Sequence, residues 1–168
     1  VGSEMCIRDS GMAVGGGFEI AMAAEFVVAA DHATFFLPET GLGIIPDAGA
    51  IRLPRQLPPV LANEVLYGGR RLGAVEAERW GLVNRVVPAA ELAHAAGELA
   101  HQIAGAAPLA VEAVMAIDRA TGHRSLEEAF AHLRSGDLEP YERMLASEDA
   151  LEGTRAFSEG RDPHWQGR

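Results

Sequence analysis

Short apolar runs separated by glycine and proline make up the first part of the chain. Phe26–Ala30 and residues 34–37 are compact apolar runs that predict two short strands, the second of which ends at Pro38. Helix-forming residues after the glycine triplet predict a helix over residues 17–25. Glycines and prolines between residues 41 and 49 predict a loop rather than one regular element.

From residue 48 onward the spacing of apolar residues is typical of helices, with one exception. Helices are predicted at residues 48–57, 59–67, 73–80, 91–104, 108–121, 125–136 and 147–159, and a strand is predicted at residues 82–87. Pro59 has the favoured N-terminal position of its helix, and Ser125 followed by Glu128 is a capping-box pattern. The chain should therefore be one α/β domain, with strands in a site region at 11–88 and a helical C-terminal region at 89–168.

Residues 1–10 (VGSEMCIRDS) have neither helical nor strand periodicity, and they lack the apolar stretch of a signal peptide. The run from Met5 to Asp9 resembles a translated sequencing adapter. We interpret residues 1–10 as a non-native leader and leave Cys6 out of the functional reasoning. The alternative is an ordinary disordered tail.

Composition and charge exclude several kinds of function. The net charge of −10 argues against partners such as nucleic acid or an anionic membrane, and no apolar run approaches ~20 residues, the length of a membrane span. The single cysteine allows no intrachain disulfide or cysteine metal site and favours a reducing, cytoplasmic location. The six histidines are scattered, so no metal site is predicted. A local group of arginines is either a solvated helical surface or a contact to ligand phosphates; its members are Arg52, Arg55, Arg70 and Arg71.

Two glutamates are the candidate chemical groups. Glu19 lies two residues after the glycine triplet 15–17, in an otherwise apolar run, and Glu39 follows Pro38. A glycine-rich turn lets backbone amides approach a ligand closely, and a carboxyl on the next helical turn would lie beside that ligand. An amide donor with two carboxyls is the minimum needed for proton transfer next to a thioester carbonyl.

The motifs at residues 11–19 (GMAVGGGFE), 37–39 (LPE) and 41–46 (GLGIIP) resemble those of the crotonase (enoyl-CoA hydratase/isomerase) superfamily. The resemblance covers residues 11–168. It implies a crotonase/ClpP-like α/β spiral of ββα units whose N-terminal part is missing here, followed by a helical C-terminal oligomerisation region. It also implies assembly as a homotrimer or a dimer of trimers.

The resemblance implies reversible addition of water to a 2-enoyl-CoA, with the acyl-CoA thioester as substrate and no separate cofactor. The amide of Gly16 would hold the thioester oxygen. Glu19 would activate the water or protonate the leaving hydroxyl, and Glu39 would exchange the proton at the α-carbon. Gly15, Pro38 and Leu42 would line the substrate site.

Further motifs resemble the branch of this family that serves carnitine metabolism. They are residues 52–55 (RLPR), 80–85 (WGLVNR) and 161–168 (RDPHWQGR). Typical family members have glycine where this chain has Asp47. We hypothesise that the Asp47 carboxylate favours a trimethylammonium substrate; the alternative is that Asp47 caps the helix predicted from residue 48.

Several alternatives stay open. Within the class these are a hydratase of ordinary fatty-acyl substrates and, less favoured because both glutamates are present, a Δ3,Δ2-enoyl-CoA isomerase. A non-catalytic crotonase-like scaffold belongs to a different class. The resemblance places a second oxyanion amide and much of the CoA-binding surface on an N-terminal segment that this chain lacks, so we expect little or no activity from the 168 residues alone.

Overall fold

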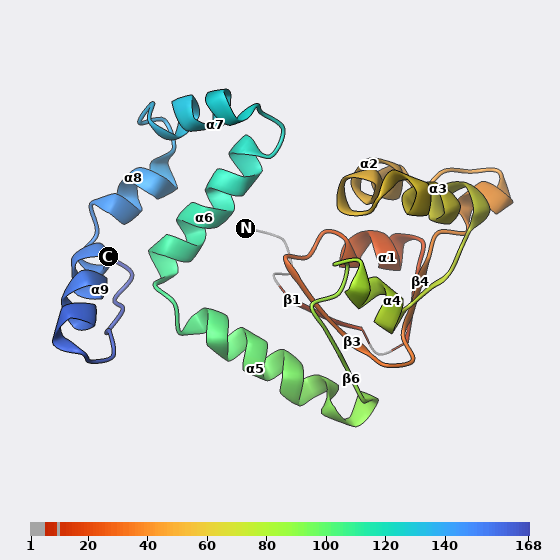
Figure 1. The fold of residues 1–168 in the computed structure, drawn as a ribbon, viewed down its shortest axis with the longest axis horizontal. Helices are drawn as coiled ribbons and strands as arrows, with labels where there is room; N and C mark the ends of the chain where they lie inside the picture. Colours follow the sequence, from red (N-terminus) through yellow and green to blue (C-terminus); the bar gives the residue numbers. More distant parts are fainter. Residues whose placement is uncertain (1–5, 10) are drawn as a thin grey trace. The chain divides into compact units, whose positions relative to one another are not determined.

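The structure, a computed structural model, describes residues 6–9 and 11–168. These divide into two units: one ends at Ala100 and the other comprises His101–Arg168. The division falls within a helix, later in the chain than the limit predicted at residue 88. Figure 1 shows the labelled strands in the first unit and helices α6 to α9 in the second.

Short strands form two sheets in the first unit. In chain order the strands are β1 (Cys6–Asp9), β2 (Met12–Val14), β3 (Phe26–Ala30), β4 (Thr34–Phe36), β5 (Leu72–Gly73) and β6 (Arg85–Val87). One sheet has the order β1-β3-β6 and the other β2-β4-β5. Every pairing is parallel except that of β4 with β5, which is antiparallel.

The first unit also contains helices and two 3-10 turns. They are α1 (Gly16–Ala21), the 3-10 turn η1 (Glu39–Leu42), α2 (Asp47–Gln56), α3 (Pro59–Gly68), α4 (Ala74–Arg79), the 3-10 turn η2 (Ala89–Glu91) and α5 (Leu92–Ala104), whose last turn belongs to the second unit. The core is apolar and dense: Phe18 of α1 and Phe35 of β4 are 1% exposed, with ring centroids 5.5 Å apart. Burial of each such ring contributes roughly 1.5–3 kcal/mol, so this pair fixes α1 against the β2–β4 sheet.

Helices make up the second unit, namely α6 (Pro108–Thr121), α7 (Leu126–Leu133), α8 (Glu139–Leu145) and α9 (Glu148–Glu159). The predicted capping box at the start of α7 is confirmed, because the Ser125 hydroxyl accepts from the Glu128 amide while the Glu128 carboxylate accepts from the Ser125 amide. Helix α8 was not predicted, because Pro140 breaks the apolar spacing even though it lies in the first turn of the helix.

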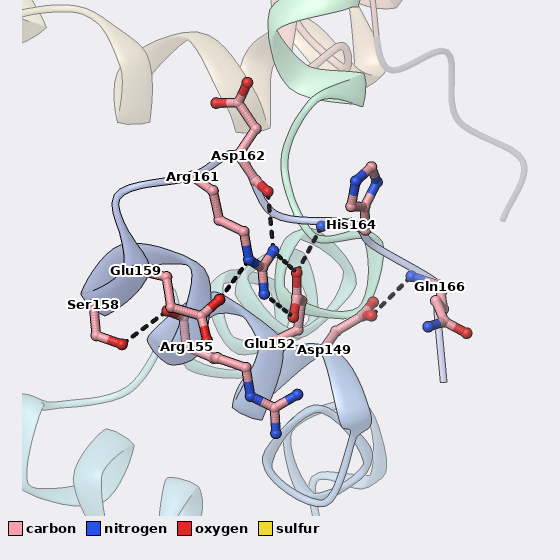
Figure 2. Close-up of polar contacts among 9 residues, drawn as sticks. All are labelled: Asp149, Glu152, Arg155, Ser158, Glu159, Arg161, Asp162, His164 and Gln166. Atoms are coloured by element: carbon pink, nitrogen blue, oxygen red, sulfur yellow. Dashed lines mark hydrogen bonds and ion pairs between the residues drawn. The ribbon is translucent and has the colours of Figure 1, made fainter.

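The C-terminal residues fold back onto α9 through two carboxylates. Asp149, only 3% exposed, accepts hydrogen bonds from the amides of Gln166 and Gly167, each at 2.8 Å. Glu152 forms a bidentate pair with the Arg161 guanidinium at 2.6 and 3.0 Å (Figure 2). The 161–168 motif therefore holds the end of the chain against its last helix.

Several predicted boundaries are wrong. Cys6–Asp9 pairs in parallel with β3 although its sequence has no strand periodicity; the other residues that we interpret as a non-native leader lie outside the described residues. Helix α1 ends at Ala21 rather than near residue 25, because Ala23 and Ala24 donate to carbonyls three residues back in a tightened final turn.

Two further boundaries differ around the later elements. Helix α2 covers Asp47–Gln56, one residue earlier at each end than the predicted helix at 48–57, and Gly49, which was also counted in the predicted loop, lies inside it. Strand β6 covers only Arg85–Val87, because Asn84 instead pairs with Val27 through its backbone amide at 2.8 Å and its side-chain oxygen at 2.7 Å.

Within residues 6–9 and 11–168, no single helix is both long and apolar enough to cross a bilayer. The bent pair Ala89–Ala104 with Pro108–Thr121 has the required length and composition only when its two helices are taken together.

Candidate functional site

Two neighbouring parallel strands deliver the candidate acids to the same edge of a sheet. Strands β2 and β4 pair with Val14 opposite Phe36, and the amide of Gly15 donates to the Phe36 carbonyl at 3.0 Å. Because parallel strands end at the same edge, the segments that follow them begin side by side. Glu19 follows the first strand and Glu39 the second.

Glu39 is packed against the turn that starts α1. Gly15 has φ 54° and ψ −122°, a conformation that strongly favours glycine, and an added Cβ would lie 2.5 Å from Oε1 of Glu39. The other carboxyl oxygen of Glu39, Oε2, is buried and has no hydrogen-bond partner within the described part of the chain. A buried oxygen of this kind calls for a partner that the described residues do not supply.

Glu19 lies on α1 and is held from another helix. Its own amide donates to the Gly15 carbonyl at 3.0 Å, which places it on the first turn after the glycines. Its carboxyl oxygen Oε1 accepts a hydrogen bond of 2.8 Å from the amide of Gly49 in α2. The side chain is half-buried, so one carboxyl oxygen is fixed by the protein while the group keeps access to solvent.

The contact between Glu19 and Gly49 depends on how α2 is docked. The carbonyl of Met22, just after α1, accepts from Gln56 Nε2 at 3.0 Å and from Arg52 Nη1 at 3.5 Å. Leu53, between them on α2, is completely buried. Two polar contacts and one apolar anchor thus attach α2 to the end of α1.

The remaining predicted site residues surround these acids in sequence. Gly16 is the first residue of α1, where a backbone N–H has no acceptor in the preceding turn of the helix. Pro38 precedes η1 and is half-buried, whereas Leu42 at the end of η1 is 72% exposed. These positions agree with a binding surface, and the roles predicted for them remain predictions.

Asp47 does not cap a helix. It is the exposed first residue of α2, the capping position belongs to Pro46, and the structure has no side-chain capping hydrogen bond there. The capping alternative is therefore wrong, which leaves the Asp47 carboxylate facing solvent at the N-terminus of the helix that contacts Glu19.

The predicted arginine group is not one patch with one role. Arg55 donates to the Ile51 carbonyl within its own helix. Arg70 lies between two carboxylates, which raise its pKa above the ordinary arginine value, chiefly through its hydrogen bond to Glu64. The Arg71 guanidinium stacks 4.1 Å from the centre of the Phe36 ring. For Arg52, the contact to Met22 favours a structural role over a phosphate contact.

Gly49 lies where the predicted loop (41–49) and the predicted helix (48–57) overlap, and the sequence assigned it no role in the site. Its only local signal is a glycine close to a proline, and that pattern does not indicate its distant partner. Among residues 6–9 and 11–168 there is no group of three or more His, Cys, Asp or Glu side chains that could hold a metal ion. The arrangement thus offers two carboxyls and backbone donors, a set suited to proton transfer beside a carbonyl.

Comparisons with known proteins agree with this chemistry. A family profile described as enoyl-CoA hydratase/isomerase matches residues 9–168. The carnitinyl-CoA dehydratase of Proteus mirabilis (strain HI4320) is 56% identical over 160 residues, which are 95% of this chain and 61% of that protein. The protein of the same name from Escherichia coli (strain K12) is 55% identical with the same coverage.

Solved structures share the fold. A crystal structure of an enoyl-CoA hydratase/isomerase from Mycobacterium paratuberculosis superimposes with a TM-score of 0.87 at 32% identity, and the match covers 97% of this chain and 63% of that one. The chain thus spans about three fifths of the length of the relatives that it matches.

Proposed function

Because the chain belongs to the enoyl-CoA hydratase/isomerase family and has its fold, we propose that it carries the acid–base centre of an enzyme that reversibly hydrates a 2-enoyl-CoA thioester. The favoured reaction is the dehydration of carnitinyl-CoA to crotonobetainyl-CoA and water. The coenzyme A is part of the substrate, and no separate cofactor enters the proposal.

In the direction of hydration, the oxygen of a water molecule attacks the β-carbon while Glu19 takes a proton from that water. Electrons shift to the thioester oxygen, where the Gly16 amide stabilises the negative charge. Glu39 then gives its proton to the α-carbon, and the carbonyl re-forms. In dehydration, Glu39 takes the α-proton, Glu19 protonates the departing hydroxyl, and water leaves.

The main observation behind the proposal is that the two carboxyls have different surroundings. Glu19 has one oxygen fixed by the Gly49 amide, while Glu39 has a buried oxygen without a partner in the described chain. A structural carboxylate would have its buried oxygens bonded. A group that alternately holds and releases a proton to a substrate has a reason to lack a fixed partner.

Asp47 supports the carnitine-derived substrate over an uncharged one. Its exposed carboxylate lies two residues before the amide that holds Glu19, and no capping bond engages it. A trimethylammonium group carries a positive charge, and a nearby carboxylate favours it electrostatically. The similarity to relatives named carnitinyl-CoA dehydratase points the same way.

The test uses a chimera, because the chain spans only part of its relatives. Residues 9–168 are joined to the part of the P. mirabilis relative that they do not match. We expect the chimera to hydrate crotonobetainyl-CoA faster than crotonyl-CoA, and the loss of enoyl-thioester absorbance measures both rates. The 168-residue chain alone should have little or no activity.

The controls separate the alternatives. Replacement of Glu19 or Glu39 by glutamine should lower kcat by about 10²–10⁴-fold, the usual contribution of a general acid or base. A preference for crotonyl-CoA would favour the ordinary fatty-acyl hydratase. CoA-thioester binding without turnover by the chimera would refute the enzymatic proposal and favour a scaffold.

We also propose assembly as a homotrimer or a dimer of trimers. Large apolar side chains on the helices of the second unit support this, since Leu126, Leu151 and Phe157 are between 69% and 90% exposed. Light scattering of the chimera tests it, and a monomer at micromolar concentration would contradict it.

A further inference from the structure

On the basis of the proposed function, we infer that Gly49 is a positioning residue for the carboxyl of Glu19. The Gly49 amide donates to Oε1 of Glu19 at 2.8 Å, from a position 30 residues later in the chain. It is the third residue of α2, so its N–H has no acceptor within that helix and is available to another group. A backbone donor cannot rotate away, so it fixes the direction of the carboxyl.

Close approach explains why this position is a glycine. Gly49 is buried inside a helix, where glycine is less favourable than alanine, and its backbone needs no positive φ. An added Cβ would lie 2.8 Å from Cδ1 of Leu37 and 3.1 Å from Cβ of Pro46. A methyl group here would push the start of α2 away from the segment that leads to Glu39, and the donor would move with it.

Contacts farther along α2 fix the position of the Gly49 amide. At the other end of the helix, Gln56 and Arg52 donate to the Met22 carbonyl directly after α1. Helix α2 is therefore attached to α1 both at the carboxyl of Glu19 and at the end of α1. The amide of Gly49 is a fixed part of the scaffold rather than a mobile loop donor.

The contact is tested first in the 168-residue chain by NMR with ¹⁵N-labelled glycine. Replacement of Glu19 by alanine should move the Gly49 amide proton upfield, because its hydrogen-bond acceptor is lost. The matched control is Glu91→Ala, which replaces an exposed acid of η2. A Gly49 resonance that responds equally to both substitutions, or to neither, would overturn the inference whatever the activity.

The effect on catalysis is tested in the chimera. Gly49→Ala should lower kcat by about 10–100-fold, the usual effect of displacing a supporting hydrogen bond, with KM changed less than about twofold. Gly68→Ala in α3, where an added Cβ meets nothing within 4 Å, is the control and should leave kcat unchanged. Leu37→Val removes the clashing Cδ1, so combined with Gly49→Ala it should restore part of kcat, or folding if the single variant fails to fold.

A double-mutant comparison decides whether Gly49 acts through Glu19. In a Glu19→Gln background, Gly49→Ala should cause no further loss of kcat, because the group it positions is already gone. If the two substitutions together lower kcat by the product of their separate factors, the inference is overturned. No turnover by the unmodified chimera would instead refute the proposed function. The NMR result would still show whether the Gly49 amide bonds to Glu19.

Discussion

Gly15→Ala is the substitution whose cost can be worked out most directly from the geometry. Gly15 has φ 54° and ψ −122°, and an alanine Cβ there would lie 2.5 Å from Oε1 of Glu39. The backbone conformation alone should cost about 1–3 kcal/mol for a non-glycine residue. Because the clashing atom is the end of a flexible side chain, moving it should add about 0.5–1.5 kcal/mol, the cost of an unfavourable rotamer.

Together these effects predict a loss of about 1.5–4.5 kcal/mol, which in a chain of this size lowers the melting temperature by roughly 3–18 °C. Thermal unfolding of the 168-residue chain followed by circular dichroism measures it. Gly17→Ala is the matched control, because an added Cβ there meets nothing within 4 Å, and it should change stability little.

The two contributions separate in a Glu39→Ala background. There the clash is absent, so only the backbone cost of Gly15→Ala should remain, and the difference between backgrounds should equal the steric part. The reasoning is refuted if Gly15→Ala costs less than about 0.5 kcal/mol or no more than Gly17→Ala, since the positive φ would then impose no penalty.

Three other predictions address substrate charge, pH and capping. Asp47→Gly should reduce the preference of the chimera for crotonobetainyl-CoA over crotonyl-CoA by up to about fivefold, as for one exposed charge pair, and an unchanged preference defeats the charge proposal. Hydrogen bonds from Arg161 lower the pKa of Glu152 to about 2 from the ordinary 4.5, so its contribution to stability is present above about pH 4.5 and is lost as the pH falls toward 2. As the pH is lowered from about 4.5 to 2, the melting temperature should fall more steeply for the unmodified chain than for Glu152→Gln. Equal slopes of melting temperature against pH would contradict this. Ser125→Ala should cost about 1 kcal/mol by removing the α7 cap, and urea unfolding that matches the natural chain would show the capping box to be unimportant.

The sequence indicated the two acids because each carries a local signal. Glu19 is a charged residue in an apolar run directly after a glycine triplet, and Glu39 follows an apolar strand and Pro38. Such patterns act over a few residues, the range over which sequence predicts structure reliably. Helix α6, with Pro108 at its start, was predicted with both boundaries correct for the same reason.

The supporting contacts could not be predicted, because their partners are distant and often belong to the backbone. Any residue except proline has an N–H, so nothing in the sequence marks Gly49 as the donor to Glu19. Asp149 is similar: its acidic side chain resembles a solvated helix start, yet it is buried because the amides of residues 166 and 167 reach it. Strand β1 was missed because a strand that depends on pairing with β3 needs no pattern of its own.

The register of β2 against β4 links the fold to the chemistry. Ala13 is 4% exposed and lies opposite Phe35, while its neighbour Met12 is 69% exposed, so the two faces of β2 differ sharply. A slip by one residue would turn Met12 toward the core and would move the segment after β2 by about 3.3 Å along β4. That displacement exceeds the tolerance of a hydrogen bond, so Glu19 would lose the Gly49 amide while Glu39 stayed in place. The small buried side chain of Ala13 thus helps to set the relation between the two acids.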